Sequence, residues 1–111
     1  MKHGNVNELA DLPVSHDPEI KKRVLLQNGD VPHVTQVARH VFLPQQVARS
    51  HSHTDMYELF VCLSGQGVAV VNGAPYVLTP GAFVLIEPND AHEIKNDGSE
   101  HLVLAQLGVA E

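Results

Sequence analysis

The sequence predicts an all-β sandwich or barrel. Short apolar runs, several of them rich in β-branched residues, follow one another along most of the chain, and turn residues separate them at regular intervals. No stretch has the pattern of a clear long helix. Asn72-Gly73 stands between two such runs and is the strongest short-range signal for a β-hairpin. Many short strands without long helices indicate an antiparallel all-β domain.

The first part of the chain is expected to be a polar arm. Residues 1–19 are polar, and one helical turn is expected over residues 5–12. Asp17-Pro18-Glu19 is typical of a helix start or a tight turn. A first strand is expected at residues 23–27, just before the turn residues Asn28-Gly29-Asp30.

The remaining strands are expected from residue 34 onward. They cover residues 34–43, 47–53, 57–63, 68–71, 76–78, 83–86, 93–95 and 101–107. The chain is therefore divided into an N-terminal arm, residues 1–33, that is partly in the sheet, and a barrel of residues 34–109.

Composition limits the class of protein and its partners. With 111 residues the chain is long enough for one domain with a core that needs no staples, and its single cysteine excludes an internal disulfide. The formal charge of −6 argues against nucleic acid and anionic membranes as partners. No apolar run is long enough to span a membrane, and the first residues lack the pattern of a signal peptide. We therefore expect a cytoplasmic location.

Two histidines and a glutamate lie close together in the middle of the chain. His51 and His53 share a face if they lie on one strand, because successive side chains point to opposite faces. Glu58 has the wrong parity to join them on an unbroken strand, but it can join them if the chain turns at Thr54-Asp55. Two imidazoles and a carboxylate are part of a coordination shell for a divalent metal.

A third histidine is placed to complete this set. His92 follows a turn at residues 87–91, and another pair of strands would bring it beside the first three residues. The candidate metal ligands are therefore His51, His53, Glu58 and His92. The alternative is that the chain has these residues but binds no metal.

These residues resemble the first conserved motif of the cupin superfamily, G-x5-H-x-H-x3,4-E-x6-G. His51, His53, Glu58 and Gly65 match it, and Gln45 stands where the motif has its leading glycine. The resemblance is to a small single-domain cupin and extends over roughly residues 35 to 105.

The second cupin motif, G-x5-P-x-G-x2-H-x3-N, is also recognisable. Gly81, His92 and Asn96 match it, whereas Glu87 and Asn89 replace its proline and its middle glycine. Asparagine tolerates the left-handed conformation that a glycine often supplies. All four metal positions of the family pattern are therefore filled.

The resemblance implies a single cupin jelly-roll β-barrel, also called a double-stranded β-helix, with a metal inside. Three imidazoles and one carboxylate suit Fe, Mn, Zn, Ni, Co or Cu, and four protein ligands leave room for a small oxygen-bearing substrate. Dioxygenase, isomerase, decarboxylase and lyase reactions all occur among such proteins. The alternatives are a non-catalytic cupin that binds or senses a small ligand, and a metal-free epimerase-like cupin with a histidine base.

Strand parity predicts which side chains line the cavity. The side chains expected to share the inner face with the four ligands are Phe60, Cys62, Val47, Arg49, Ile94 and Asn96. Arg49 is then a candidate handle for a substrate carboxylate, and Tyr57 is a second candidate substrate contact.

The same parity turns apolar side chains outward. Leu59, Val61 and Leu63 would face away from the cavity, although an antiparallel strand with one face in water should alternate. Large exposed apolar patches usually mark an interface. We therefore expect a homodimer that packs sheet against sheet, with the arm before Val34 reaching across.

Overall fold

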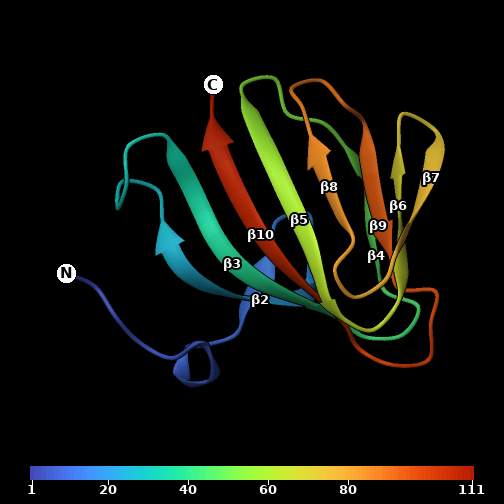
Figure 1. The fold of residues 1–111 in the computed structure, drawn as a ribbon, viewed down its shortest axis with the longest axis horizontal. Helices are drawn as coiled ribbons and strands as arrows, with labels where there is room; N and C mark the ends of the chain where they lie inside the picture. The colour runs from blue at the N-terminus through green and yellow to red at the C-terminus, as the bar shows by residue number, and fades with distance from the viewer.

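Two antiparallel β-sheets face each other in the computed structural model, which describes residues 1–111 (Figure 1). The larger sheet has the strand order β1-β2-β3-β10-β5-β8, and the smaller has the order β4-β9-β6-β7. The strands are β1 (Leu12–Val14), β2 (Asp17–Gln27), β3 (Val34–Phe42), β4 (Val47–His51), β5 (Met56–Ser64), β6 (Gly67–Val71), β7 (Ala74–Leu78), β8 (Phe83–Ile86), β9 (His92–Lys95) and β10 (Leu102–Ala110). The predicted all-β jelly-roll is confirmed.

The strands expected from residue 34 onward are all present, with ends that differ by a few residues. The hairpin at Asn72-Gly73 is confirmed, because β6 pairs with β7 and both turn residues have positive φ, at 50° and 83°. The only helical element is one 3-10 turn, η1 (Val6–Glu8), so no helix of the structure is of a length that could cross a bilayer.

The arm contains more strand than the sequence indicates. The prediction of a helix start or tight turn at Asp17 is wrong, because β2 begins there and runs to Gln27. The turn lies one step earlier, where His16 has a φ of 68°. Leu12–Val14 pairs with β2 as an edge strand, in place of the end of the expected helical turn. Pairing with β3 supplies the hydrogen bonds that keep β2 extended.

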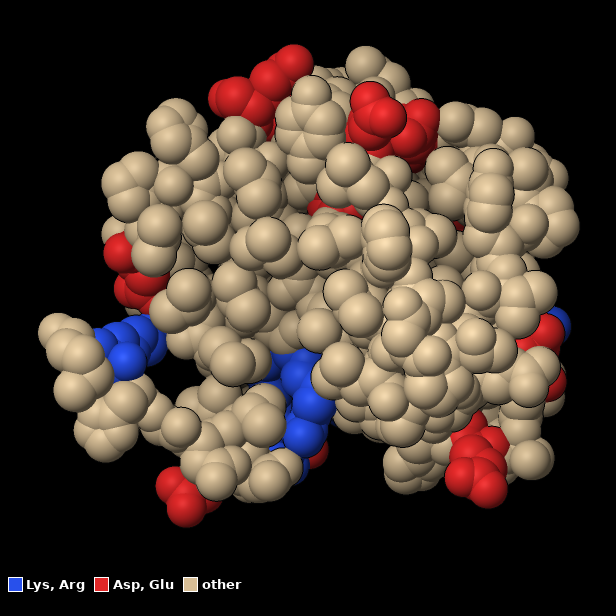
Figure 2. Space-filling view, in the orientation of Figure 1, with Lys and Arg blue, Asp and Glu red and all other residues tan.

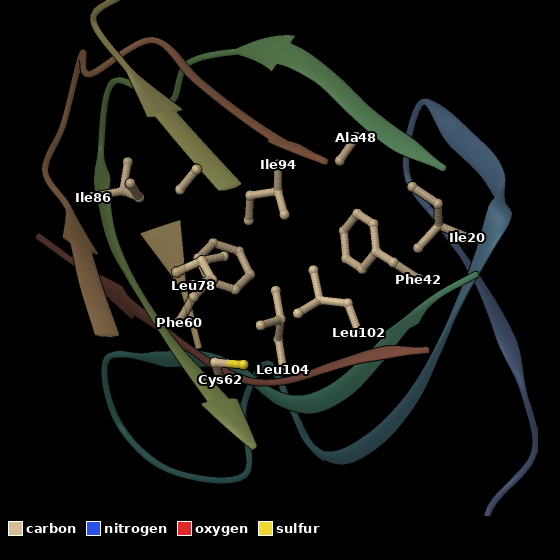
Figure 3. Close-up of a cluster of buried hydrophobic side chains, with 11 residues drawn as sticks. Ile20, Phe42, Ala48, Phe60, Cys62, Leu78, Ile86, Ile94, Leu102 and Leu104 are labelled. Atoms are coloured by element: carbon tan, nitrogen blue, oxygen red, sulfur yellow. The ribbon is translucent and has the colours of Figure 1, made fainter. Parts of the chain in front are cut away.

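Buried apolar side chains fill the space between the sheets. Figure 3 shows Phe42, Ile94, Leu102 and Leu104 pointing toward one another from strands of both sheets. On β5, buried and partly exposed residues alternate, so that Phe60 and Cys62 point inward as predicted. Every second residue of β10 is buried in the same way.

The outer face of the larger sheet is apolar over β5, β8 and β10. Leu59 lies between Leu85 and Leu107 on the neighbouring strands, while Val61 lies between Phe83 and Ala105. Phe83 is 68% exposed and Leu85 is 53% exposed. On the side of the molecule that carries β10 and β5, most charged side chains lie toward the edges (Figure 2).

Gly65 occupies a turn that no other residue fits well. Its φ is 82°, and a Cβ atom added there would collide with the backbone carbonyl of His101. Gly73 has almost the same φ, 83°, but a Cβ atom there would meet nothing within 4 Å. An alanine at position 73 would therefore cause backbone strain alone, whereas an alanine at position 65 would cause both strain and a steric collision.

We predict that Gly65→Ala destabilises the protein at least twice as much as Gly73→Ala. The Gly73 variant bears only the strain of a left-handed alanine, about 1–2 kcal/mol. The Gly65 variant must in addition displace the β10 backbone near His101. Urea unfolding of both variants measures the difference in the free energy of unfolding. Equal losses would mean that the turn before β6 relaxes freely.

Candidate metal centre

The four predicted ligand residues converge at one place inside the barrel. His51 ends β4 and His92 begins β9, and the two residues are opposite each other in the register of these strands. His53 follows β4 by two residues, and Glu58 comes from β5 of the other sheet. One nitrogen or oxygen atom from each residue lies within 4.8 Å of the other three. The expected turn at Thr54-Asp55 thus brings Glu58 back to the two histidines.

Backbone contacts orient two of the imidazoles. The Nδ1 atom of His51 lies 2.9 Å from the carbonyl oxygen of Arg49, and that of His92 lies 3.0 Å from the carbonyl oxygen of Asp90. Because a carbonyl oxygen can only accept a hydrogen bond, Nδ1 donates in both rings. Each neutral ring therefore keeps a free lone pair on Nε2, which is how metal-binding histidines are usually held.

The atoms at the centre of the cluster lack hydrogen-bond partners. Glu58 Oε1 lies 3.3 Å from His92 Nε2 and 3.4 Å from His53 Nε2. Glu58 Oε1 and His92 Nε2 are both buried and make no hydrogen bond of good geometry. Buried polar atoms without partners are costly, and a cation between these atoms would satisfy both of them. The residues therefore fit a metal.

Electrostatics within the cluster favour an ionised carboxylate. Burial raises the pKa of Glu58, but the His92 imidazole, the Gln106 amide and His53 lower it more, and the net shift is downward. Burial lowers the pKa of His92, whereas the Glu58 carboxylate and the Asp90 carbonyl raise it more, and the net shift is upward. The negative charge thus attracts a cation, and protons compete for the same imidazole.

An irregularity in β4 alters the predicted inner face. Ala48 is opposite Ile94 and His51 is opposite His92, so β4 has two residues where β9 has one. Such a bulge turns the residues on either side of it toward the same face. Ala48 is buried in consequence, and the inward orientation predicted for Arg49 and Val47 is wrong.

Neither candidate substrate contact lines the cavity. The Arg49 side chain is 73% exposed, and its Nε atom lies 2.8 Å from the buried carboxylate of Asp17. Arg49 therefore ties β4 to the start of β2 on the outside of the barrel. Tyr57 is half-buried and alternates with the inward-facing Glu58, so it belongs to the opposite face of β5.

One wall of the cavity is polar and was not predicted from the sequence. The cavity has a volume of about 380 Å³. Lys22 Nζ donates to Gln36 Oε1 at 2.9 Å, and Gln36 Nε2 donates to Gln106 Oε1 at 2.9 Å. Gln106 Nε2 then donates to Glu58 Oε2 at 3.0 Å. These residues come from separate strands, so no motif spacing connects them. The available signal was that Gln106 interrupts the inward-facing apolar positions of β10.

Comparison with solved structures identifies similar folds. A predicted oxalate decarboxylase from Thermotoga maritima superposes with a TM-score of 0.89 and 20% identity, covering 96% of this chain and 97% of that one. The polyketide cyclase RemF from Streptomyces resistomycificus has a TM-score of 0.82 and 17% identity, covering 99% and 79%. At these identities the likeness extends to the fold alone.

The similarity to curated proteins covers a shorter part of the chain. The HTH-type transcriptional activator RhaS of Yersinia pestis (strain Pestoides F) is 38% identical over 56 residues, which is 50% of this chain. The matched region is only 20% of the length of RhaS. A family model described as "Cupin domain" matches residues 38–108, well over half of the chain. The two motifs, the jelly-roll and this match agree, and the chain belongs to the cupin family.

Proposed function

We propose that this chain binds one divalent transition metal through His51, His53, Glu58 and His92 and uses it to act on a small oxygen-bearing molecule. The observation that carries this proposal is the convergence of buried donor atoms without partners, Glu58 Oε1 and His92 Nε2, beside two further imidazoles. Three nitrogen donors and one oxygen donor suit Fe, Mn, Zn, Ni, Co or Cu. When bound, such a metal supplies Lewis-acid chemistry or an activated water.

The residues around the cluster have distinct tasks in this proposal. Glu58 and the three imidazoles would bind the metal. Gln106 donates a hydrogen bond to the second carboxylate oxygen of Glu58. The apolar side chains of Phe42, Phe60 and Ile94 line the adjoining cavity and exclude water from a bound molecule. The reaction classes that the fold admits are dioxygenase, isomerase, decarboxylase and lyase. Similarity to a predicted oxalate decarboxylase and to a polyketide cyclase is consistent with catalysis.

A non-catalytic sensing role is the second candidate, and the similarity to the activator RhaS favours it. In this case the cavity binds a small molecule, and the metal has no position that exchanges with water. Water relaxation on the manganese-loaded protein and turnover on a substrate panel separate the two candidates. Exchangeable water together with turnover supports the enzyme, whereas saturable ligand binding without either supports the sensor.

We also propose a homodimer formed by the outer faces of two larger sheets. The support is the exposed apolar surface that Phe83 and Leu85 extend from Leu59 and Val61. A contiguous surface of this kind is uncommon on a monomer and is typical of an interface. A second copy presents the same apolar surface of β5, β8 and β10, so the contact is self-complementary.

We predict about one transition metal per chain in untagged protein that is purified without chelator or metal column. His92→Ala and His53→Ala should each abolish stoichiometric binding, because each removes a central nitrogen donor. His101→Ala is the matched control, since His101 is exposed and lies outside the cluster. Elemental analysis measures the content, and circular dichroism checks that the variants fold. Full metal content in both cluster variants would move the site elsewhere.

We predict that metal is lost as the pH falls through the histidine range, at about pH 6. Protons compete with metal for the imidazole nitrogens. Because the pKa of metal-free His92 is raised, its protonation begins at a higher pH than that of an ordinary imidazole, and loss should begin correspondingly early. Glu58 has a lowered pKa and stays ionised through this range. Metal content that is constant down to about pH 4 would contradict the ligand set.

We predict a dimer at micromolar concentration by light scattering. Phe83→Lys should shift the protein toward the monomer, because it places a charge within the exposed apolar surface that forms the proposed interface. Val77→Lys is the control, since Val77 is 66% exposed on β7 of the other sheet. A wild-type monomer, or equal dissociation in both variants, would contradict the proposed interface.

A further inference from the structure

The cavity contains one lysine, Lys22, and no arginine. Lys22 makes no ion pair, and its ammonium group donates one hydrogen bond, to Gln36, at 2.9 Å. Two of its three N–H donors are therefore available to a ligand. Burial lowers the pKa of Lys22, and the Glu58 carboxylate opposes this shift. A negatively charged group in the cavity would compensate the half-buried ammonium.

Two further polar side chains of the same wall have unpartnered atoms. His40 Nε2 and Thr35 Oγ1 are buried without a hydrogen bond, although both residues line the cavity. Lys22 and His40 are opposite each other in the register of β2 and β3. Side chains in this relation have Cβ atoms roughly 5 Å apart. Burial lowers the pKa of His40 to about 4, so its imidazole is neutral at pH 7.

A bulge and a glycine open this part of the wall. Gln36 pairs with Gly108 and Val34 pairs with Val109, so Thr35 is the extra residue of β3. A Cβ atom at position 108 would collide with Thr35 Oγ1. Gly108 therefore leaves the space that the Thr35 side chain occupies next to the cavity.

We propose that Lys22, Thr35 and His40 form a carboxylate-binding subsite, and that the ligand is a small acid with a further oxygen that reaches the His51–His92 cluster. Contact of the further oxygen with the metal cluster rests on the proposed function, whereas binding of the carboxylate at the subsite does not. The Lys22 ammonium, the Thr35 hydroxyl and a neutral His40 ring with its proton on Nε2 match a single negative charge shared by two oxygens. A phosphate dianion would leave uncompensated charge in a half-buried place. Lys22 thus takes the role that the sequence suggests for Arg49.

The strand register also separates the subsite from the metal cluster. Glu58 and Gln36 are both opposite Gly108, on the two strands that flank β10. Their backbones are therefore two strand spacings apart, roughly 10 Å. The amide chain through Gln36 and Gln106 spans this distance on the wall. A flexible dicarboxylate such as glutarate is a suitable probe for both ends.

The test is a titration of the metal-free and the zinc-loaded protein with glutarate. Two-dimensional NMR and calorimetry monitor the binding. We expect saturable shifts at Thr35 and His40 in both forms. Lys22→Met should weaken binding about tenfold or more, as expected for loss of a charged hydrogen bond, and Thr35→Val should weaken it less. Lys21→Met is the matched control, because Lys21 is exposed on the same strand and bonds the carbonyl of Pro18.

The outcomes distinguish a failure of the subsite from a failure of the proposed function. Equal glutarate affinity in Lys22→Met and wild type, or no saturable shift at Thr35 and His40, would overturn the subsite while leaving the metal proposal intact. Failure to take up zinc, with glutarate still bound through Lys22, would overturn the proposed function and support the subsite. Loss of binding in Lys21→Met as well would point to surface charge and overturn the assignment of Lys22.

Discussion

The central constraint on this molecule is the carboxylate of Glu58, which is ionised and buried inside the barrel. A lone charge in such a place costs several kcal/mol, so its surroundings must compensate it. Gln106 donates to one oxygen, and the other oxygen faces His53 and His92. In the absence of a cation, His92 is the group that can share this charge by taking a proton, as its raised pKa indicates. A metal bound in this cluster would therefore compete with protons for one position.

Strand geometry gives this cluster its precision. His51 and His92 lie opposite each other on paired strands, and backbone carbonyls hold both rings through Nδ1. Glu58 approaches from the other sheet, so the cluster joins the two layers of the barrel. Sites built on strands move less than sites built on loops, and a preorganised donor set loses little entropy when it binds a cation.

The alternation of side chains along β5 creates both the interior site and the exterior surface. Because side chains on β5 point in and out in turn, the pattern that directs Glu58 and Phe60 inward directs Leu59 and Val61 outward. The outer positions remain apolar, and β8 extends them with Phe83 and Leu85. The proposed ligand site lies on the inner face and the proposed dimer contact lies on the outer face, so a shift of register by one residue would destroy both.

Local sequence patterns were sufficient for the strands from residue 34 onward, the Asn72-Gly73 hairpin and the convergence of His51 with Glu58, because alternation and turn preference act over a few residues. The tertiary structure alone decided the orientation of Arg49. Its parity depends on a bulge that forms only when β4 pairs with β9. The wall that links Lys22 to Glu58 is likewise assembled from four strands, and two of its three hydrogen bonds join residues 70 and 48 positions apart. Side chains that come together only through pairing of distant strands have no fixed spacing in the sequence, so no short motif predicts their contact.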